Sequence, residues 1–413
     1  MKRPSGKYID KTFWGLFITL GIIAFIALFS ASSTLVYERD SIIGPVGKQL
    51  AFLILGFAFI MQFAGSWMIR WGGYKLLICA DVMVWSLLLP KTLNPFKVVR
   101  NEAARWINLF GIEFEPSEIA KLALIIVVAD LLSKIKTEED KRKYFLLTLV
   151  YTIITILPIM TSNMSTAILL GVIVFIMWIL ARIPAKYTWG TAGIVVATGA
   201  DIFSLVAFIV IPNKIKLPDP FGRLNMQVQR VLDKFNENED NNTFVLTNKN
   251  YQPSLAKVAV ARGGATPFGV FPGNSQERDY LPQAFADYIF AIIVEETGII
   301  GAIGLIILYL AILFRACWTS SRFNDYPAML MVMGLALMIT CQALVSMMVA
   351  VGIGPVTGQP LPLISRGGTS VIITSIYIGV MLCVSREQAE RQSQQLSVQN
   401  DSEEDVPDIE EDI

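Results

Sequence analysis

The chain has 413 residues, of which 54% are hydrophobic and only 16% are charged. Soluble domains carry about a quarter charged residues, so this composition excludes a soluble enzyme with one or two packed cores. The 34 basic residues equal the 34 acidic residues, which gives no electrostatic case for nucleic-acid binding. The chain has no histidine. A histidine general base, a Ser-His or Cys-His nucleophile system and every histidine-containing metal site are therefore excluded.

Apolar runs long enough to cross a bilayer recur along most of the chain. A spanning helix needs about 20 mostly apolar residues. The sequence therefore predicts an all-α polytopic membrane protein with about ten transmembrane helices. The first run lacks a small-residue cleavage site, which predicts a retained helix and not a signal peptide. The ten runs are 12–34, 48–68, 73–90, 117–134, 144–161, 163–182, 187–212, 288–316, 326–352 and 369–385.

Lysine and arginine residues predict the orientation of these helices. They cluster before the first run and in alternate turns, and the positive-inside rule places such clusters in the cytoplasm. An even number of spans then puts both termini in the cytoplasm. One predicted outer loop breaks the rule, because it carries Lys91, Lys97, Arg100 and Arg105. We therefore expect these outward-facing cations to have a function.

The same analysis predicts how the chain is organised into segments. A cytoplasmic N-terminal tail covers 1–11, the membrane domain covers 12–385 and an acidic cytoplasmic tail covers 386–413. The last residues, DSEEDVPDIEEDI, are typical either of a solvated disordered tail or of a docking peptide for a partner.

A large extracytoplasmic loop over 213–287 lies between the seventh and eighth predicted helices. Its segment YQPSLAKVAVARGG predicts a short amphipathic or re-entrant helix. The Gly-rich ATPFGVFPGNSQ that follows can turn tightly and expose backbone N–H groups. Ser275 and Gln276 in this stretch are either donors to a phosphate or sugar, or simply part of a turn.

Several ionisable residues fall inside the apolar runs, where a charge is costly and usually faces a cavity, a partner or a pathway. Glu118 and Lys121 are three residues apart and share one helix face, so an internal ion pair is the simplest interpretation. Glu295 and Glu296 lie about two turns into the eighth run. They either form hydrogen bonds between helices or couple the movement of an ion or proton.

Asp287 lies at the outer end of the large loop, immediately before an apolar helix. That position suits an N-cap, whose carboxylate accepts hydrogen bonds from backbone N–H groups. It also suits a general base, because an apolar pocket that meets extracellular water raises the pKa of a carboxyl group. Position alone leaves both interpretations open.

Three strings in a fixed order resemble the SEDS family, the shape, elongation, division and sporulation proteins. They are ARWI followed by EPSEIAKLA, then GNSQERDYLPQAFADYIFAIIVEETG, and finally GIGPVTGQPLPLISRGGTS. The resemblance covers nearly the whole chain and is closer to the division branch than to the elongation branch. It implies a ten-helix peptidoglycan glycosyltransferase. Such an enzyme polymerises lipid II, the undecaprenyl-diphosphate-linked disaccharide pentapeptide, at the outer face of the cytoplasmic membrane.

The resemblance also implies roles for individual residues. Asp287 matches the acidic residue that is regarded as catalytic in the family. Arg105 lies in a matched motif and is the best candidate to hold the diphosphate. Trp106 is expected either to pack on the lipid or sugar, or to anchor the chain at the membrane interface. The full substrate-binding set predicted in this way is Arg105, Trp106, Glu118, Lys121, Ser275, Gln276 and Arg366.

The chain departs from the family pattern at four places. Phe285-Ala286 replaces the usual His-Thr, and Ser162-Asn163 replaces the usual Pro-Asp, with loss of a carboxylate. Glu115 replaces a glutamine, and Arg366 replaces an aromatic residue. None of these changes removes Asp287, and all of them bear on substrate contact.

The resemblance to the division branch implies partners and a location. A class B penicillin-binding transpeptidase is expected to pack against the helices, with other divisome proteins nearby and no nucleic acid. The expected location is the cytoplasmic membrane at the division septum. A divalent cation such as Mg²⁺ at the diphosphate stays an open alternative, because the sequence shows no dedicated ligand cluster. Three other functions also stay open: a lipid II flippase or transporter, an elongation polymerase, and a non-catalytic divisome scaffold.

Overall fold

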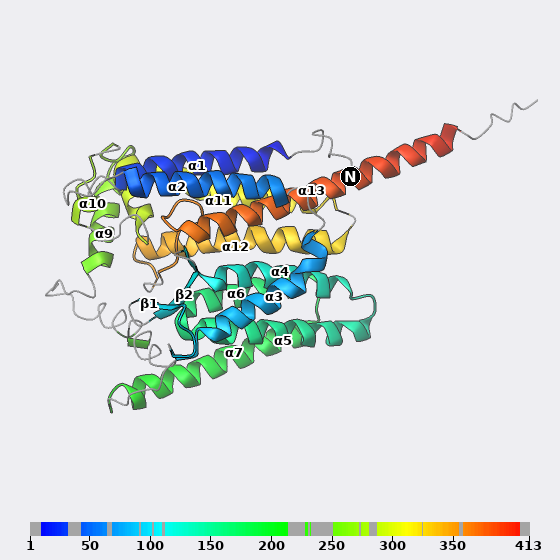
Figure 1. Cartoon of the computed structure of the whole chain (residues 1–413), viewed down its shortest axis with the longest axis horizontal. Helices are drawn as coiled ribbons and strands as arrows, with labels where there is room; N and C mark the ends of the chain where they lie inside the picture. Colours follow the sequence, from blue (N-terminus) through cyan, green and yellow to red (C-terminus); the bar gives the residue numbers. More distant parts are fainter. Residues whose placement is uncertain are drawn as a thin grey trace, which may run out of the picture.

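A computed structural model of the chain shows long helices packed lengthwise into a bundle (Figure 1). It describes residues 10–31, 43–63, 68–90, 92–100, 103–109, 112–213, 228–229, 232, 251–271, 274–280, 287–323, 325–354 and 358–404. Phe285 and Ala286, where the sequence departs from the family pattern, lie outside these ranges.

Ten helices of at least 17 residues form the body of the described chain, and each predicted apolar run coincides with one of them. They are α1 (Lys11–Ala31), α2 (Ile43–Phe63), α3 (Met68–Ser86), α4 (Pro116–Ser133), α5 (Glu138–Ser162), α6 (Met164–Leu180), α7 (Ala185–Leu205), α11 (Ile289–Ser320), α12 (Tyr326–Ala350) and α13 (Gly368–Glu404). A π-helical turn, η3 (Val206–Val210), continues α7.

Six of the helices in the described residues combine the length and the apolar composition that a membrane span requires. Many large apolar side chains on the bundle surface are exposed, for example Val196 on α7 and Phe314 on α11. Such a surface belongs in lipid, because no water-soluble chain leaves so much apolar surface uncovered. The chain is therefore a multi-pass membrane protein, as predicted, whereas the figure of ten spans stays a prediction.

The sequence predicted no strands, yet a small antiparallel sheet lies between α3 and α4. Its order is β1 (Lys97–Arg100), β2 (Ala103–Leu109) and β3 (Ile112–Phe114). The strands are only three to seven residues long. A search for apolar runs of spanning length cannot detect segments this short. The predicted basic loop thus contains an ordered sheet. Lys97, Arg100 and Arg105 lie on its strands, and Lys91 lies outside the described residues.

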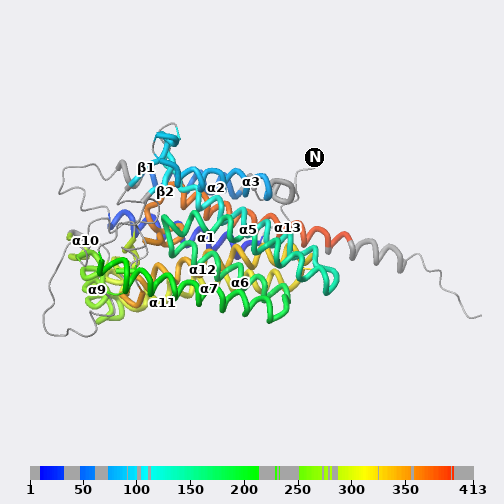
Figure 2. Tube along the Cα trace, turned by 90° about the horizontal axis from the view of Figure 1, so that it is seen from below, coloured from blue at the N-terminus to red at the C-terminus, as the bar shows by residue number. Residues whose placement is uncertain are grey.

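The sheet, α9 (Tyr251–Gly264) and α10 (Glu277–Tyr280) gather at one end of the bundle (Figures 1 and 2). The predicted short helix in the large loop is therefore confirmed as α9. At the opposite end α13 projects beyond the other helices. It remains helical to Glu404, past the predicted start of the tail at 386, because no glycine or proline interrupts 385–404.

Helix α4 is the centre of the bundle. It contacts α3, α5, α6, α12 and α13, and it is buried on nearly every face. Pro116 occupies its first turn, where the missing N–H costs nothing. The next helix, α5, begins with a capping box in which the Thr137 hydroxyl and the Asp140 carboxylate satisfy each other's backbone N–H groups.

Helix α11 is bent where it meets the loop that follows α9. Gly298 interrupts the helix with φ 70°, and Gly269 in the loop also has a positive φ of 65°. A side chain at either glycine would overlap the backbone of the other segment. The Val270 N–H donates to the Glu295 carbonyl at 2.9 Å. This part of the large loop is therefore fixed against α11 at Glu295–Gly298.

We expect Gly263→Ala to destabilise the protein, because a Cβ atom at this α9 position would overlap the carbonyl oxygen of Val294 on α11. Overpacking of this kind costs about 1–3 kcal/mol. Gly193→Ala in α7 is the matched control, because nothing lies within 4 Å of a Cβ atom there. Thermal unfolding in detergent should show a lower midpoint for Gly263→Ala alone. Equal midpoints would contradict this packing.

Candidate active site

Arg105 owes its position to an irregularity in the sheet. Trp106 is opposite Val98 and Ala104 is opposite Val99, so Arg105 is the extra residue of a β-bulge in β2. Bulges re-aim side chains and are common next to active sites. The Arg105 Nε donates to the Ser162 carbonyl at 3.0 Å. This carbonyl belongs to the last turn of α5, where the helix dipole favours a cation.

Asp287 is not the N-cap of α11, so that interpretation is wrong. The capping position belongs to Tyr288, and no side-chain hydrogen bond caps the helix. Asp287 is half-buried, and this burial raises the pKa of its carboxyl group, while the Arg105 guanidinium opposes that rise. The carboxylate is therefore left available for another role beside a cation.

The side chains of Asp287 and Arg105 both lie next to Gly358. A Cβ atom at this glycine would lie 3.7 Å from the Asp287 Oδ2 and 3.8 Å from the Arg105 Nη1. The backbone of Gly358 has φ 62°, a conformation that favours glycine. A carboxylate and a guanidinium thus share one small region, and any larger residue at 358 would enter it.

Side chains from several helices hold the segment that follows Gly358. The Gln359 Nε2 donates to the Asn163 Oδ1 at 3.3 Å and to the Thr166 hydroxyl. The Gln342 Nε2 on α12 donates to the Pro360 carbonyl at 3.2 Å. The Tyr309 hydroxyl on α11 donates to the carbonyl of Pro362. The segment 359–362 is therefore hydrogen-bonded to α6, α11 and α12.

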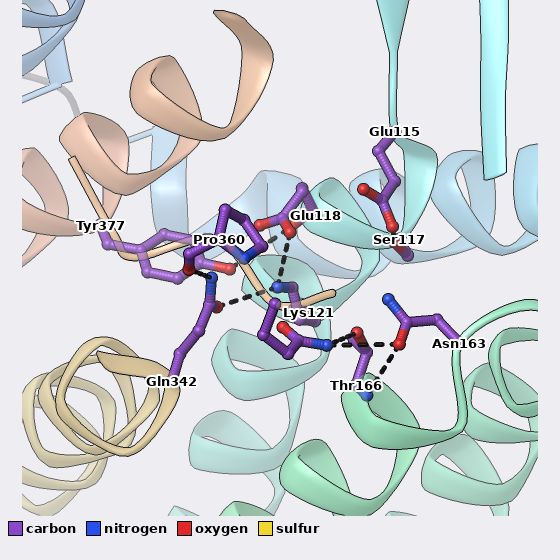
Figure 3. Close-up of polar contacts among 10 residues, drawn as sticks. Glu115, Ser117, Glu118, Lys121, Asn163, Thr166, Gln342, Pro360 and Tyr377 are labelled. Carbon is purple, nitrogen blue, oxygen red and sulfur yellow. Dashed lines mark hydrogen bonds and ion pairs between the residues drawn. The ribbon is translucent and has the colours of Figure 1, made fainter. Parts of the chain in front are cut away.

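Glu118 and Lys121 form the predicted ion pair, with 2.8 Å between the Glu118 Oε1 and the Lys121 Nζ (Figure 3). Lys121 is completely buried and Glu118 is nearly so. The Lys121 Nζ also donates to the Gln342 Oε1 at 3.2 Å, and the Tyr377 hydroxyl donates to the Glu118 carbonyl at 3.3 Å. Through Gln342 the pair supports the segment at Pro360.

Asn163 stands at one of the departures from the resembled pattern, and the structure shows what its amide does. It ends α5 and begins α6, where its Oδ1 accepts a hydrogen bond from the Thr166 N–H at 3.3 Å. The same oxygen accepts the bond from Gln359. Both contacts need only an acceptor, so the amide serves here without a negative charge.

Ser275 and Gln276 donate hydrogen bonds to the carboxylate of Glu295. The Ser275 hydroxyl and the Gln276 N–H, the latter at 3.1 Å, donate to the carboxylate of Glu295. Arg262 on α9 completes the group, with 2.7 Å from its Nη1 to the Gln276 Oε1 and 3.5 Å to Glu295. In the structure these residues join the large loop to α11. Their role in binding substrate stays a prediction.

The remaining candidates are placed as follows. Trp106 is half-buried in β2 next to Arg105. Arg366 is half-buried before α13, and its burial lowers the pKa of its guanidinium. Glu296 accepts a hydrogen bond from the Ser30 hydroxyl on α1, which fits the predicted bonding between helices. Within the described ranges, no three acidic or cysteine side chains form a metal-binding group.

Sequence reasoning missed four residues of this site: Gly358, Gln359, Gln342 and Arg262. Gly358, Gln359 and Pro360 stand in the quoted string GQPLP, so their presence in a matched motif was the available signal. Arg262 lies in the predicted short helix YQPSLAKVAVARGG, and Gln342 lies in an apolar run, but nothing in either segment indicates a polar partner. Only the packing of α12 on α4 and of α9 on α11 gives them a role.

The cell cycle protein family of FtsW, RodA and SpoVE matches residues 10–390 of this sequence. The chain belongs to this family. The resemblance to SEDS proteins noted in the sequence is therefore confirmed across nearly all of the chain.

Relatives from both branches of the family are similar to this chain. The probable peptidoglycan glycosyltransferase FtsW of Enterococcus hirae is 28% identical over 95% of this chain and 96% of that protein. The FtsW of Saccharophagus degradans is 32% identical over 83% of each. The peptidoglycan glycosyltransferase MrdB of Escherichia coli K12 is 24% identical over 91% of this chain and 95% of that protein.

Solved structures share the fold. A chain of a peptidoglycan synthase complex has a TM-score of 0.71 and 22% identity, with 92% of this chain and 99% of that chain covered. Thermus thermophilus RodA, a rod shape determining protein, has a TM-score of 0.64 and 19% identity, with 93% and 99% covered. The helical arrangement described above is therefore the fold of this family.

We expect Lys121→Met to destabilise the protein strongly, because it leaves the buried Glu118 carboxylate without its cation. Removing one partner of a buried ion pair costs about 3–5 kcal/mol. The double variant Glu118→Gln/Lys121→Met removes both charges and should recover much of the loss. Size-exclusion profiles and thermal unfolding midpoints in detergent measure this. A double variant as unstable as the single one would contradict the ion-pair explanation.

Proposed function

We propose that this protein is a peptidoglycan glycosyltransferase that polymerises lipid II, with Asp287 as the general base. The relatives named as peptidoglycan glycosyltransferases support the activity. The observation that carries the assignment of the residue is the meeting of Asp287 and Arg105 at Gly358. A desolvated carboxylate beside a fixed cation provides two of the groups that this reaction needs.

The reaction transfers a glycosyl group from a lipid diphosphate to a sugar hydroxyl. The hydroxyl oxygen attacks the anomeric carbon as the bond from that carbon to the diphosphate oxygen breaks. Asp287 takes the hydroxyl proton, and the departing lipid diphosphate keeps the bonding electron pair. Arg105 stabilises the charge that develops on the diphosphate. No histidine is available to act as the base, and a carboxylate with a raised pKa suits that role near neutral pH.

We also propose an orientation for the protein in the membrane. The sheet, α9 and α10 would face the outside, with both termini in the cytoplasm and the acidic tail beyond 386. Support comes from the clustering of these elements at one end of the bundle and the projection of α13 from the other (Figure 1). The positive-inside pattern of the sequence points the same way.

The proposed setting is cell division. The string VTGQPLPLISRGGTS and the FtsW relatives support the division branch. The matching chain in a peptidoglycan synthase complex supports a class B penicillin-binding transpeptidase as partner. Other divisome proteins and a septal location follow from the same branch assignment.

An assay with labelled lipid II separates this function from its alternatives. Purified protein, with and without its transpeptidase, should produce glycan ladders that transpeptidase-blocking β-lactams do not abolish. Lipid movement across a bilayer without polymer would indicate a flippase. Neither activity, together with an intact complex, would indicate a scaffold.

We expect Asp287→Asn to abolish polymerisation while the protein folds and binds its partner normally. Loss of a general base lowers the rate by about 10²–10⁴-fold. Glu113→Gln on β3 is the control, because it removes one negative charge from the same end of the bundle. Glycan ladders from each variant measure the effect. Normal ladders from Asp287→Asn would refute the catalytic assignment.

The rate should rise with pH as Asp287 loses its proton, because only the carboxylate accepts a proton. Burial raises the pKa of Asp287 and Arg105 opposes that rise. We therefore expect Arg105→Gln to move this acidic limb of the pH–rate profile to higher pH and to weaken substrate binding. The measurement is turnover at saturating lipid II across the acidic range. An acidic limb at the same pH in Arg105→Gln would show that Arg105 does not influence the pKa of Asp287.

A further inference from the structure

Gln359 directly follows Gly358, the glycine that lies next to both charged groups of the site. It is buried, with only 3% of the residue exposed, and a buried amide needs hydrogen-bond partners. The Gln359 Nε2 donates to the Asn163 Oδ1 at 3.3 Å and to the Thr166 hydroxyl. Figure 3 shows both bonds and labels Asn163 and Thr166. Gln359 therefore joins the segment after α12 to the junction between α5 and α6.

The same junction holds Arg105. Its Nε donates to the Ser162 carbonyl at 3.0 Å, and this carbonyl belongs to the peptide group between Ser162 and Asn163. A peptide group is planar and rigid, so a shift of Asn163 also shifts the oxygen that Arg105 contacts. Asn163 stands between the two helices with φ −150° and ψ 81°, so its own backbone is not helical. Its side-chain hydrogen bonds therefore contribute to where the Ser162 carbonyl lies.

These contacts form a closed ring around the site. Its members in order are Arg105, Ser162, Asn163, Gln359 and Gly358. The ring closes because a Cβ atom at Gly358 would lie 3.8 Å from the Arg105 Nη1, and it would lie 3.7 Å from the Asp287 Oδ2. The hydrogen bond from Gln359 to Asn163 thus links the segment beside Asp287 to the segment that supports the guanidinium.

A second hydrogen bond joins the same segment to a different helix. The Tyr309 hydroxyl on α11 donates to the carbonyl of Pro362, and Tyr309 is completely buried. Loss of this bond or of the Gln359 bond would weaken the attachment of the segment to the bundle. Of the two, the Gln359 bond is the one that continues to Arg105, through the α5–α6 junction. Tyr309 therefore offers a matched comparison for Gln359.

We propose that Gln359 is a positioning residue for the Arg105 guanidinium. Through Asn163 it fixes the distance from this cation to the Asp287 carboxylate, and so it governs how the site binds a diphosphate and transfers the glycosyl group. The inference rests on the proposed function for the identity of the anion and of the reaction. Donors aligned in advance stabilise developing charge without reorganisation, and a misplacement of about 1 Å lowers a rate by up to about 10²-fold.

The test compares Gln359→Met with Tyr309→Phe in the binding of lipid II to full-length protein in nanodiscs. All proteins carry Asp287→Asn, which stops turnover. Methionine keeps the length of glutamine without its donor, and phenylalanine removes only the hydroxyl. We expect Gln359→Met to raise the dissociation constant about tenfold, because a displaced guanidinium loses a charge-assisted hydrogen bond to the diphosphate. Tyr309→Phe should lower the thermal unfolding midpoint and leave the dissociation constant unchanged, because it leaves the Arg105 support in place.

A double-variant cycle tests whether Gln359 acts through Arg105. In an Arg105→Gln background there is no guanidinium to position, so Gln359→Met should change the dissociation constant by less than about twofold. Asn163→Ser removes the same hydrogen bond from its other side and keeps an oxygen that can cap α6. It should reproduce the tenfold loss, and it carries the test if Gln359→Met does not fold.

Three results would overturn the proposal. The first is an unchanged dissociation constant in folded Gln359→Met protein. The second is an equal loss of affinity in Gln359→Met and Tyr309→Phe, because the role of Gln359 would then be structural. The third is an equal loss with and without the Arg105 guanidinium, because Gln359 would then act on the substrate by another route.

A polymerisation assay on protein with Asp287 intact keeps the two proposals apart. Gln359→Met should lower turnover at saturating lipid II by about 10–10²-fold, and full turnover would contradict the positioning role. Glycan ladders from the unsubstituted protein, without coupling between Gln359 and Arg105, would reject that role and leave the glycosyltransferase in place. Coupling in lipid II binding without any polymer would reject the glycosyltransferase and leave a positioned site for a lipid diphosphate.

Discussion

The Arg105 guanidinium is the contact on which the site depends. Its Nε is fixed on the Ser162 carbonyl, and its Nη1 lies beside Gly358 together with the Asp287 carboxylate. Three segments far apart in the chain therefore meet at one side chain. An arginine suits this position because its planar group carries five donors in a fixed geometry and stays charged when partly buried. A lysine could not make these separate contacts at once.

The meeting point is held in place by polar groups in the middle of an apolar bundle. Lys121 is fully buried, which is tolerable only because Glu118 and Gln342 bind it. Gln342 in turn fixes the Pro360 carbonyl two residues from Gly358. Each of these groups forms a hydrogen bond or ion pair with another. A substitution in α4 would therefore affect the region of Asp287 and Arg105 through the segment after α12. Stability and geometry of the site are thus coupled.

Local sequence signals predicted the parts of the structure that depend on local physics. Apolar runs near spanning length marked the ten long helices, and a spacing of three residues predicted the bond between Glu118 and Lys121. The same signals could not detect strands of three to seven residues. They also could not decide the role of Asp287, because a residue before a helix suits a cap and a base equally well. The cap belongs to Tyr288 only in the folded chain.

The sequence by itself determined a membrane protein of long helices, its family, and the exclusion of a histidine base. Composition, periodicity and motif order suffice for these conclusions, because each of these signals can be read along the chain without knowing which distant residues come into contact. Tertiary structure alone decided that Asp287 and Arg105 meet at Gly358 and that Ser275 donates a hydrogen bond to Glu295. Charges and hydrogen-bond donors act over a few ångströms in space, and residues as far apart in the sequence as Arg105 and Gly358 reach that distance only when the helices pack.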